Sequence, residues 1–165
     1  MREVRHEELN GNVFKMINSD WMLVTAECGG KVNTMTASWG GVGELWGKYV
    51  AFVFIRPQRY TFEFTEKTDR MTLTFFGGEK RDALVLCGSK SGRDCDKIAE
   101  AGLVPVSVDG YPTFEGASVV MECRKIYADL LKEDCMLDKE ILKHYEEKDY
   151  HRVYVCEIEK ILVKD

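Results

Sequence analysis

Small hydroxyl residues, an aromatic ring and two arginines lie on either side of one short apolar run. The first segment, residues 33–41, reads Asn-Thr-Met-Thr-Ala-Ser-Trp-Gly-Gly, and the second, residues 54–61, reads Phe-Ile-Arg-Pro-Gln-Arg-Tyr-Thr. Hydroxyls and guanidinium groups donate hydrogen bonds, and arginine keeps its charge, so both suit a phosphate. A Trp or Phe face beside such donors suits a flat ring. The two segments together predict a nucleotide or flavin pocket.

The two arginines flank Pro57 at a predicted turn from a strand into a helix. Arg56 and Arg59, with Thr61 and the N–H groups of the first helical turn, could meet one phosphate. Surface ion pairs are an equally good interpretation from local sequence. The threonines of the first segment also have an ordinary interpretation, an edge strand, because threonine favours strands.

A third segment, residues 88–94, reads Gly-Ser-Lys-Ser-Gly-Arg-Asp. It places hydroxyls, Lys90 and Arg93 at a predicted helix start, where the helix dipole favours an anion. A solvated, charged loop with a helix cap is the alternative interpretation.

Other motifs that carry chemistry are incomplete. The glycines of residues 41–47 lack the third glycine of a dinucleotide fingerprint and the Ser/Thr of a P-loop, so they predict a flexible connection. Two tryptophans, Trp39 just before this connection and Trp46 within it, could border a ligand. His6, His144 and His151 have no recognisable Ser/His/Asp or Cys/His context, although His151 begins the last predicted strand and could reach a pocket.

Composition sets the outer limits. The chain has 165 residues, 18.9 kDa, a net charge of -5 and a pI of about 5.3, which predict one domain over residues 1–165 and no nucleic-acid or anionic-membrane partner. The charged first eight residues and the lack of a long apolar run predict no signal peptide, no membrane span and a cytoplasmic protein. Six scattered cysteines without a C-x-x-C pair predict reduced thiols and no metal site.

Alternation and turn residues predict a mainly β fold with short helices. We expect strands over residues 22–27, 32–38, 49–55, 71–76, 104–108, 117–127 and 152–163, with a glycine turn joining the first two. Helices are expected over residues 59–67, 81–87 and 137–145, and from residue 91 or 94 to Gly102. Six or more strands with inserted helices favour a closed or partly closed barrel over a doubly wound parallel sheet.

Four motifs occur in order: residues 33–41, residues 53–61, Leu-Thr-Phe-Phe at residues 73–76, and Ser-Gly-Arg-Asp-x-Asp-Lys at residues 91–97. With them in register, residues 21–162 resemble the flavin reductase-like family with the FMN-binding split barrel, close to its flavoredoxin branch. The resemblance implies a homodimer of six-stranded Greek-key split β-barrels that bind FMN near the dimer interface. It also implies NADH or NADPH as the electron donor.

The resemblance further implies which residues hold the cofactor. Residues 34–39 would line the isoalloxazine, residues 56 and 59–61 would hold the phosphate and ribityl end, and residues 91–97 would lie beside the flavin. The cofactor-binding residues that we expect are Asn33, Thr34, Met35, Thr36, Ala37, Ser38, Trp39, Ile55, Arg56, Arg59, Tyr60, Thr61, Ser91, Arg93 and Lys97.

Two functions then stay open. One is an NAD(P)H-dependent flavin reductase, NAD(P)H:FMN oxidoreductase, which needs no catalytic side chain because hydride passes from nicotinamide to flavin. The other is a non-catalytic FMN electron carrier that serves protein redox partners. A barrel that binds no flavin is the third and plainest interpretation.

Overall fold

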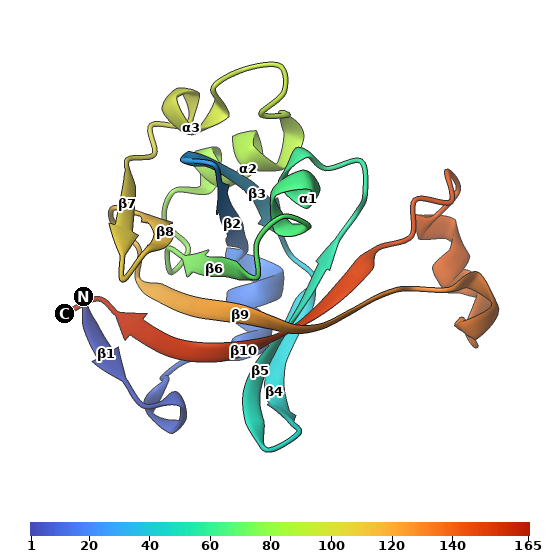
Figure 1. The fold of residues 1–165 in the computed structure, drawn as a ribbon, viewed down its shortest axis with the longest axis horizontal. Coiled ribbons are helices and arrows are strands. Elements are labelled where there is room, and N and C mark those ends of the chain that lie inside the picture. Colours follow the sequence, from blue (N-terminus) through green and yellow to red (C-terminus); the bar gives the residue numbers. More distant parts are fainter.

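Antiparallel pairing organises nearly the whole chain, and the computed structural model describes all residues 1–165 (Figure 1). The strands are β1 (Arg2–Val4), β2 (Met22–Cys28), β3 (Lys31–Ala37), β4 (Gly40–Leu45), β5 (Lys48–Ile55), β6 (Arg70–Phe75), β7 (Pro105–Val108), β8 (Tyr111–Phe114), β9 (Val119–Leu130) and β10 (Arg152–Val163). The α-helices are α1 (Tyr60–Thr65), α2 (Arg81–Ser89) and α3 (Lys97–Glu100). Eight strands form one sheet in the order β3-β2-β6-β9-β10-β5-β4, with β1 added beside β10.

Six of these eight strands, β2, β3, β5, β6, β9 and β10, are the ones that alternation predicted for the barrel, and the mainly β, split-barrel fold class is confirmed. The strand expected over residues 104–108 is β7, which pairs only with β8 in a separate two-stranded sheet. The main sheet gains β1 and β4, which sequence reasoning did not include.

The predicted flexible glycine connection is wrong, because residues 40–45 form the edge strand β4, paired along its length with β5. Gly40 has φ +150°, and a Cβ there would lie 2.8 Å from the Phe52 carbonyl oxygen. A Cβ at Gly41 or Gly43 would rest against the Phe52 ring. The glycines therefore let β4 lie close to a bulky neighbour on β5.

The glycine turn between β2 and β3 is confirmed. Cys28 pairs with Lys31, and the two turn residues, Gly29 and Gly30, have φ +61° and +75°. Positive φ at both central positions is the turn type that matches the twist of a hairpin.

One hydrophobic cluster rolls the sheet into a barrel. It contains Met35 of β3, Val53 of β5, Leu73 of β6 and Tyr154 of β10, all 6% exposed or less. Strands far apart in the sheet order share this core, so the sheet curls around it. Burying each such side chain contributes about 1.5–3 kcal/mol. No ladder joins β3 to β4 or β5, which leaves that side of the barrel open.

Three helix predictions need correction. The helix expected from residue 91 or 94 starts only at Lys97, because Asp96, rather than Ser91, caps it by accepting from the Ala99 N–H at 3.1 Å. The helix expected over residues 137–145 is a short 3-10 helix, Lys139–His144. Helix α1 spans six residues, fewer than predicted, since Glu66 ends it.

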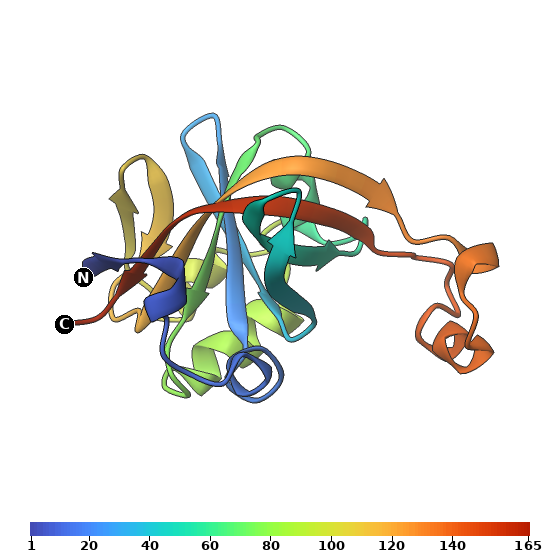
Figure 2. The same ribbon diagram turned by 90° about the horizontal axis from the view of Figure 1, so that it is seen from below.

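Residues 131–150 form an arm that projects beyond the barrel from the ends of β9 and β10 in both views, and His144 and Asp149 of this arm contact Arg56 (Figures 1 and 2). Leu137 on this arm is 96% exposed. The chain that returns from the arm, just before β10, brings Asp149 and His151 to the C-terminal end of β5.

Neither a metal centre nor a membrane helix is found. No group of three or more His, Cys, Asp or Glu side chains is arranged to hold a metal ion. None of the helices is both long enough and apolar enough to cross a bilayer. All six cysteines are free thiols, of which Cys87, Cys123 and Cys156 are buried.

Candidate functional site

The C-terminal half of β3 forms one wall of a cavity of about 210 Å³, here called the Trp39 cavity. Its lining consists of residues 35–39 together with Phe54, Arg56, Arg59 and His151. Neighbouring side chains of β3 lie on opposite faces of the strand. Met35 belongs to the core, whereas Thr36 faces α2 and donates its hydroxyl to the Leu84 carbonyl at 2.5 Å. Apolar, hydroxyl and aromatic groups thus meet in one cavity.

Arg56 lines the Trp39 cavity with its charge already balanced. It forms an ion pair with Asp149 and donates to the His144 carbonyl at 2.8 Å. Burial would raise the pKa of the Asp149 carboxyl, but hydrogen bonds from Arg56 and Gln58 outweigh burial and lower it. Arg56 therefore ties the base of the arm to the end of β5.

His151 closes the same cavity from the start of β10. Its Nδ1 lies 2.8 Å from the Tyr145 hydroxyl, and its ring centroid lies 5.4 Å from that of Trp39. Burial, helped by the nearby Arg56 charge, lowers the pKa of His151 to about 4. The imidazole is consequently neutral at physiological pH and presents Nε2, which makes no hydrogen bond within the chain, as its remaining polar atom.

A second cavity of about 250 Å³, the Tyr60 cavity, adjoins the first through Arg59, which lines both. Residues 58–60 form one side, and residues 89–91 with Arg93, Asp94 and Lys97 form the other. The hydroxyls of Ser89 and Ser91 belong to this lining.

Two cations converge at the Tyr60 cavity, and neither forms an ion pair with a carboxylate. Arg59 Nη2 and Lys97 Nζ both donate to the Cys87 carbonyl, at 3.3 and 3.2 Å, and Lys97 also donates to the Lys90 carbonyl at 3.1 Å. Neither side chain takes part in an ion pair. Lys97 is only 3% exposed, and burial lowers its pKa to about 8; burial also lowers the pKa of Arg59.

The sequence predicted an anion site at a helix start formed by residues 88–94, but no helix begins in this segment. Residues 88–94 include the last two residues of α2 and the chain that follows its C-terminal end, whose carbonyls attract cations, and they do not begin a helix. The positive charge at this point comes from Arg59 and Lys97.

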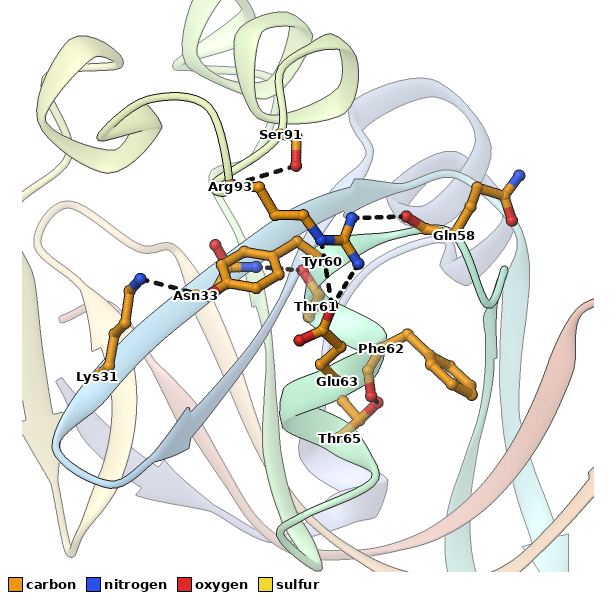
Figure 3. A network of polar contacts seen from close by, with 10 residues as sticks. All are labelled: Lys31, Asn33, Gln58, Tyr60, Thr61, Phe62, Glu63, Thr65, Ser91 and Arg93. Atoms are coloured by element: carbon orange, nitrogen blue, oxygen red, sulfur yellow. Dashed lines mark hydrogen bonds and ion pairs between the residues drawn. The ribbon is translucent and has the colours of Figure 1, made fainter.

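Arg93 acts as a clamp between this segment and α1 (Figure 3). Its guanidinium pairs with Glu63 at 2.5 Å, donates to the Gln58 carbonyl at 3.0 Å and lies 4.9 Å from the Tyr60 ring centroid. The backbone N–H of Arg93 donates to the Ser91 hydroxyl at 3.2 Å. With its charge neutralised by Glu63, Arg93 positions residues 91–97 more than it attracts an anion.

Four of the expected residues lie outside both cavities. Thr34 is buried and bonds Thr25 and the Val24 carbonyl, and Ile55 is in the core. Asn33 donates to the buried hydroxyl of Thr61 at 2.8 Å, which joins β3 to α1. These side chains support the site from beneath.

Besides His151, the cavities include residues outside the expected cofactor-binding set, namely Phe54, Gln58, Ser89, Lys90 and Asp94. All of them lie inside or beside the quoted motifs, so the motif positions were a usable signal. Their orientation depends on how residues 88–97 fold back over α1.

Solved structures share this fold. An FMN-binding protein from Thermus thermophilus with bound p-hydroxybenzaldehyde is 22% identical, with 100% of this chain and 83% of that chain covered and a TM-score of 0.69. The flavoredoxin of Desulfovibrio vulgaris is 19% identical, with 88% and 69% covered and a TM-score of 0.68. The styrene monooxygenase flavin reductase of Pseudomonas putida is 15% identical, with 88% and 79% covered and a TM-score of 0.66.

The class of fold is thus that of FMN-binding, flavin reductase-like proteins, as the sequence motifs predicted. Residues 14–165 match the flavin reductase like domain, and the chain belongs to that family. No curated protein matches the sequence.

Proposed function

We propose that the protein binds FMN and transfers hydride from NADH or NADPH to the flavin. The observation that carries this proposal is the pair Arg59 and Lys97, two cations that donate to the same carbonyl oxygen beside a cavity and form no ion pair with any carboxylate. A buried charge without a partner is costly, and a bound phosphate would offset that cost. The adjoining Trp39 cavity offers the apolar and aromatic walls that a flat ring needs.

The donor set fits the cofactor. Arg59, Lys97 and the hydroxyls of Ser89 and Ser91 would hold the phosphate, while the Trp39 cavity would take the ring. Bound FMN would supply the hydride-accepting ring system.

The chain's own groups bind, orient and shield. Met35 and Ala37 form the apolar floor, Trp39 covers the rim at 46% exposure, and neutral His151 can exchange a hydrogen bond through Nε2. No side-chain nucleophile is required, in keeping with the absence of a Ser/His/Asp arrangement among the expected residues.

The decisive experiment is an absorption spectrum of the purified protein with FMN, recorded before and after anaerobic addition of NADH or NADPH. Bleaching of the flavin band, followed by steady-state oxidation of the nicotinamide with excess FMN, supports a reductase. A protein that takes up no FMN would refute the proposal.

Charge-removing variants locate the phosphate. Arg59→Ala should weaken FMN binding roughly 10- to 150-fold, since a hydrogen bond to a charged group contributes about 1.5–3 kcal/mol. Arg56→Ala should have a smaller effect because Asp149 already balances Arg56, and Trp46→Ala should have the least. Equal retention of FMN in all three variants would contradict this placement.

The alternative function, an FMN electron carrier, is favoured by the half-exposed Trp39 at the mouth of the cavity, where a protein partner could approach. Flavin reduction by a protein donor, with no NAD(P)H oxidation, would favour it.

We also propose a homodimer in the cytoplasm; the nearly fully exposed Leu137 on the arm gives such a dimer an apolar contact. The oligomeric state of a Leu137→Asp variant, measured by light scattering, tests that contact.

A further inference from the structure

A cavity distinct from the two described above lies between the end of β3 and helix α2. It has a volume of about 300 Å³, and we call it the Trp21 cavity. Strand β3 contributes Thr36 and Ser38, α2 contributes residues 84–85 and 88–89, and Trp21 completes the lining. Thr36 and Ser38 also line the Trp39 cavity, and Ser89 also lines the Tyr60 cavity. A molecule held in the Trp21 cavity would therefore lie beside the proposed flavin site.

Trp21 has a backbone conformation that is otherwise found almost only in glycine. Its φ is 67° and its ψ is 170°. It directly follows a π-helix, Lys15–Asp20, which is a rare form that often occurs at functional sites. Glycine would adopt this conformation without strain. The strain therefore points to the indole side chain as the reason that a residue other than glycine stands here.

Contacts from α2 and from the π-helix hold the indole in place. The guanidinium carbon of Arg81 lies 3.2 Å from the centroid of the Trp21 ring, and Arg81 also donates to the Ser19 carbonyl at 2.7 Å. The indole N–H donates to the Asn18 carbonyl at 3.1 Å. The ring is thus a fixed wall of the cavity before any ligand binds, which lowers the entropic cost of binding.

The lining of the Trp21 cavity contains no charged side chain and three hydroxyls. Two of the hydroxyls already donate to carbonyls of α2, Thr36 at 2.5 Å and Ser89 at 3.0 Å. The Ser38 hydroxyl makes no hydrogen bond within the chain. It is the one side-chain polar group in the lining that is left to meet a ligand. The cavity therefore suits an uncharged molecule with a single hydrogen-bond acceptor.

The size of the cavity limits the ligand further. An apolar cavity of about 150 Å³ can hold benzene, so the volume of about 300 Å³ suits one substituted aromatic ring. Leu84 and Val85 supply apolar surface beside the indole. A nucleotide does not suit this cavity, because Arg59 and Lys97, the cations that would meet a phosphate, are absent from its lining.

We infer that the Trp21 cavity binds a small, uncharged aromatic molecule with one hydrogen-bond acceptor, of which an aryl ketone is the simplest example. Its ring would lie against Trp21 and Val85, and its acceptor would meet the Ser38 hydroxyl. The inference goes beyond the proposed function, because neither flavin reduction nor electron carriage needs a second organic ligand. The binding of FMN and the binding of this molecule can also fail independently of each other.

Binding of acetophenone to the full-length protein, with and without FMN, tests the inference. The indole N–H resonance of Trp21, assigned by elimination with Trp39→Phe and Trp46→Phe, should shift as acetophenone is added. Benzoate should bind at least about tenfold more weakly, because no cation lines the cavity. No shift of this resonance at about 10 mM acetophenone would overturn the inference. Displacement of acetophenone by FMN would show that the cavity belongs to the flavin site and would also overturn it.

A substitution that fills the cavity provides the matched comparison. Val85→Phe should weaken acetophenone binding about tenfold or more and leave FMN affinity within about twofold, since Val85 lines neither of the other two cavities. The control is Val104→Phe, the same change at a residue that lines none of the three cavities and is 51% exposed, against 50% for Val85. Equal acetophenone affinities in the two variants would refute the placement.

Removal of the free hydroxyl tests how the ligand is oriented. Ser38→Ala should weaken acetophenone binding roughly 2- to 12-fold, which is the contribution of one hydrogen bond between neutral groups. Toluene, a similar ring without an acceptor, should bind this variant as it binds the wild type. If the variant loses affinity for both molecules equally, or for neither, the Ser38 hydroxyl does not meet the acceptor and the inference fails.

Discussion

The pH dependence of FMN binding should depend on Lys97. In the free protein, burial lowers the pKa of Lys97 to about 8, and the only hydrogen-bond acceptors of its Nζ are two carbonyl oxygens. A phosphate bound in the Tyr60 cavity would favour the charged ammonium and raise that pKa. Binding above pH 8 therefore requires the uptake of a proton, and FMN affinity should fall as the pH rises.

The size of the effect follows from linkage between protonation and binding. Below pH 8 the free protein already holds the proton, so affinity is flat from pH 7 to about pH 7.5. Above pH 8, FMN affinity should fall about tenfold per pH unit, which makes binding at pH 9.5 roughly 30-fold weaker than at pH 7. A phosphate monoester loses its second proton near pH 6, so its charge stays constant over this range.

Two substitutions separate the charge from its titration. Lys97→Met should weaken FMN binding at pH 7 by roughly 10- to 150-fold and remove the pH dependence. Lys97→Arg keeps a charge that does not titrate below pH 10, so its affinity should be flat whatever its absolute value. Calorimetric titrations at pH 7.0, 8.0, 8.8 and 9.5 give the comparison. A wild-type affinity that is constant to pH 9.5, or a Lys97→Met protein with the same slope as wild type, would refute the reasoning.

Two further substitutions test the buried, neutral His151 and the close packing of Gly92 against Asn33. Because burial lowers the pKa of His151 from 6.5 to about 4, the unfolded chain binds more protons between these values. Wild-type stability should therefore fall by about 3 kcal/mol as the pH drops from 6.5 to 4. Urea unfolding of His151→Gln should show a smaller fall, with His144→Gln as the control, and equal falls would disprove the assignment. A Cβ at Gly92 would lie 2.3 Å from Asn33 Oδ1, so Gly92→Ala should displace residues 91–97 and lower FMN affinity in a binding titration. Gly41→Ala, whose nearest contact is 3.8 Å, should not, and unchanged binding in both variants would count against the close packing.

Much of the fold follows from short-range pattern. Alternation identified the strands that build the barrel, and two adjacent glycines fixed the β2–β3 turn because both need positive φ. The edge strand β4 did not follow, since its glycines look like a loop until the Phe52 ring is seen beneath them. That reason is tertiary, and no local pattern contains it.

The meeting of the two segments was predictable from the sequence, and their binding of a cofactor stays a prediction. The hydroxyl and arginine segments do meet in one place, and Arg59 lines both cavities, as their residue types suggested. The roles of the other two arginines could not be predicted from sequence. Arg56 pairs with Asp149, 93 residues away, and Arg93 pairs with Glu63, 30 residues away. Such partners depend on how the arm and residues 88–97 return to the barrel.

At position 97, the stability of the free protein and the binding of FMN favour different side chains. A buried ammonium with only carbonyl partners destabilises the free protein, and replacing such a charge by an apolar side chain of similar length is often neutral or stabilising. Lys97→Met should therefore match or exceed the wild type in melting temperature without FMN. With FMN the order should reverse, because a ligand stabilises the folded state in proportion to the logarithm of its concentration over its dissociation constant. A lysine whose role was only to hold residues 88–97 in place would give a variant less stable in both conditions. The reversal on adding FMN thus distinguishes a binding lysine from a structural one.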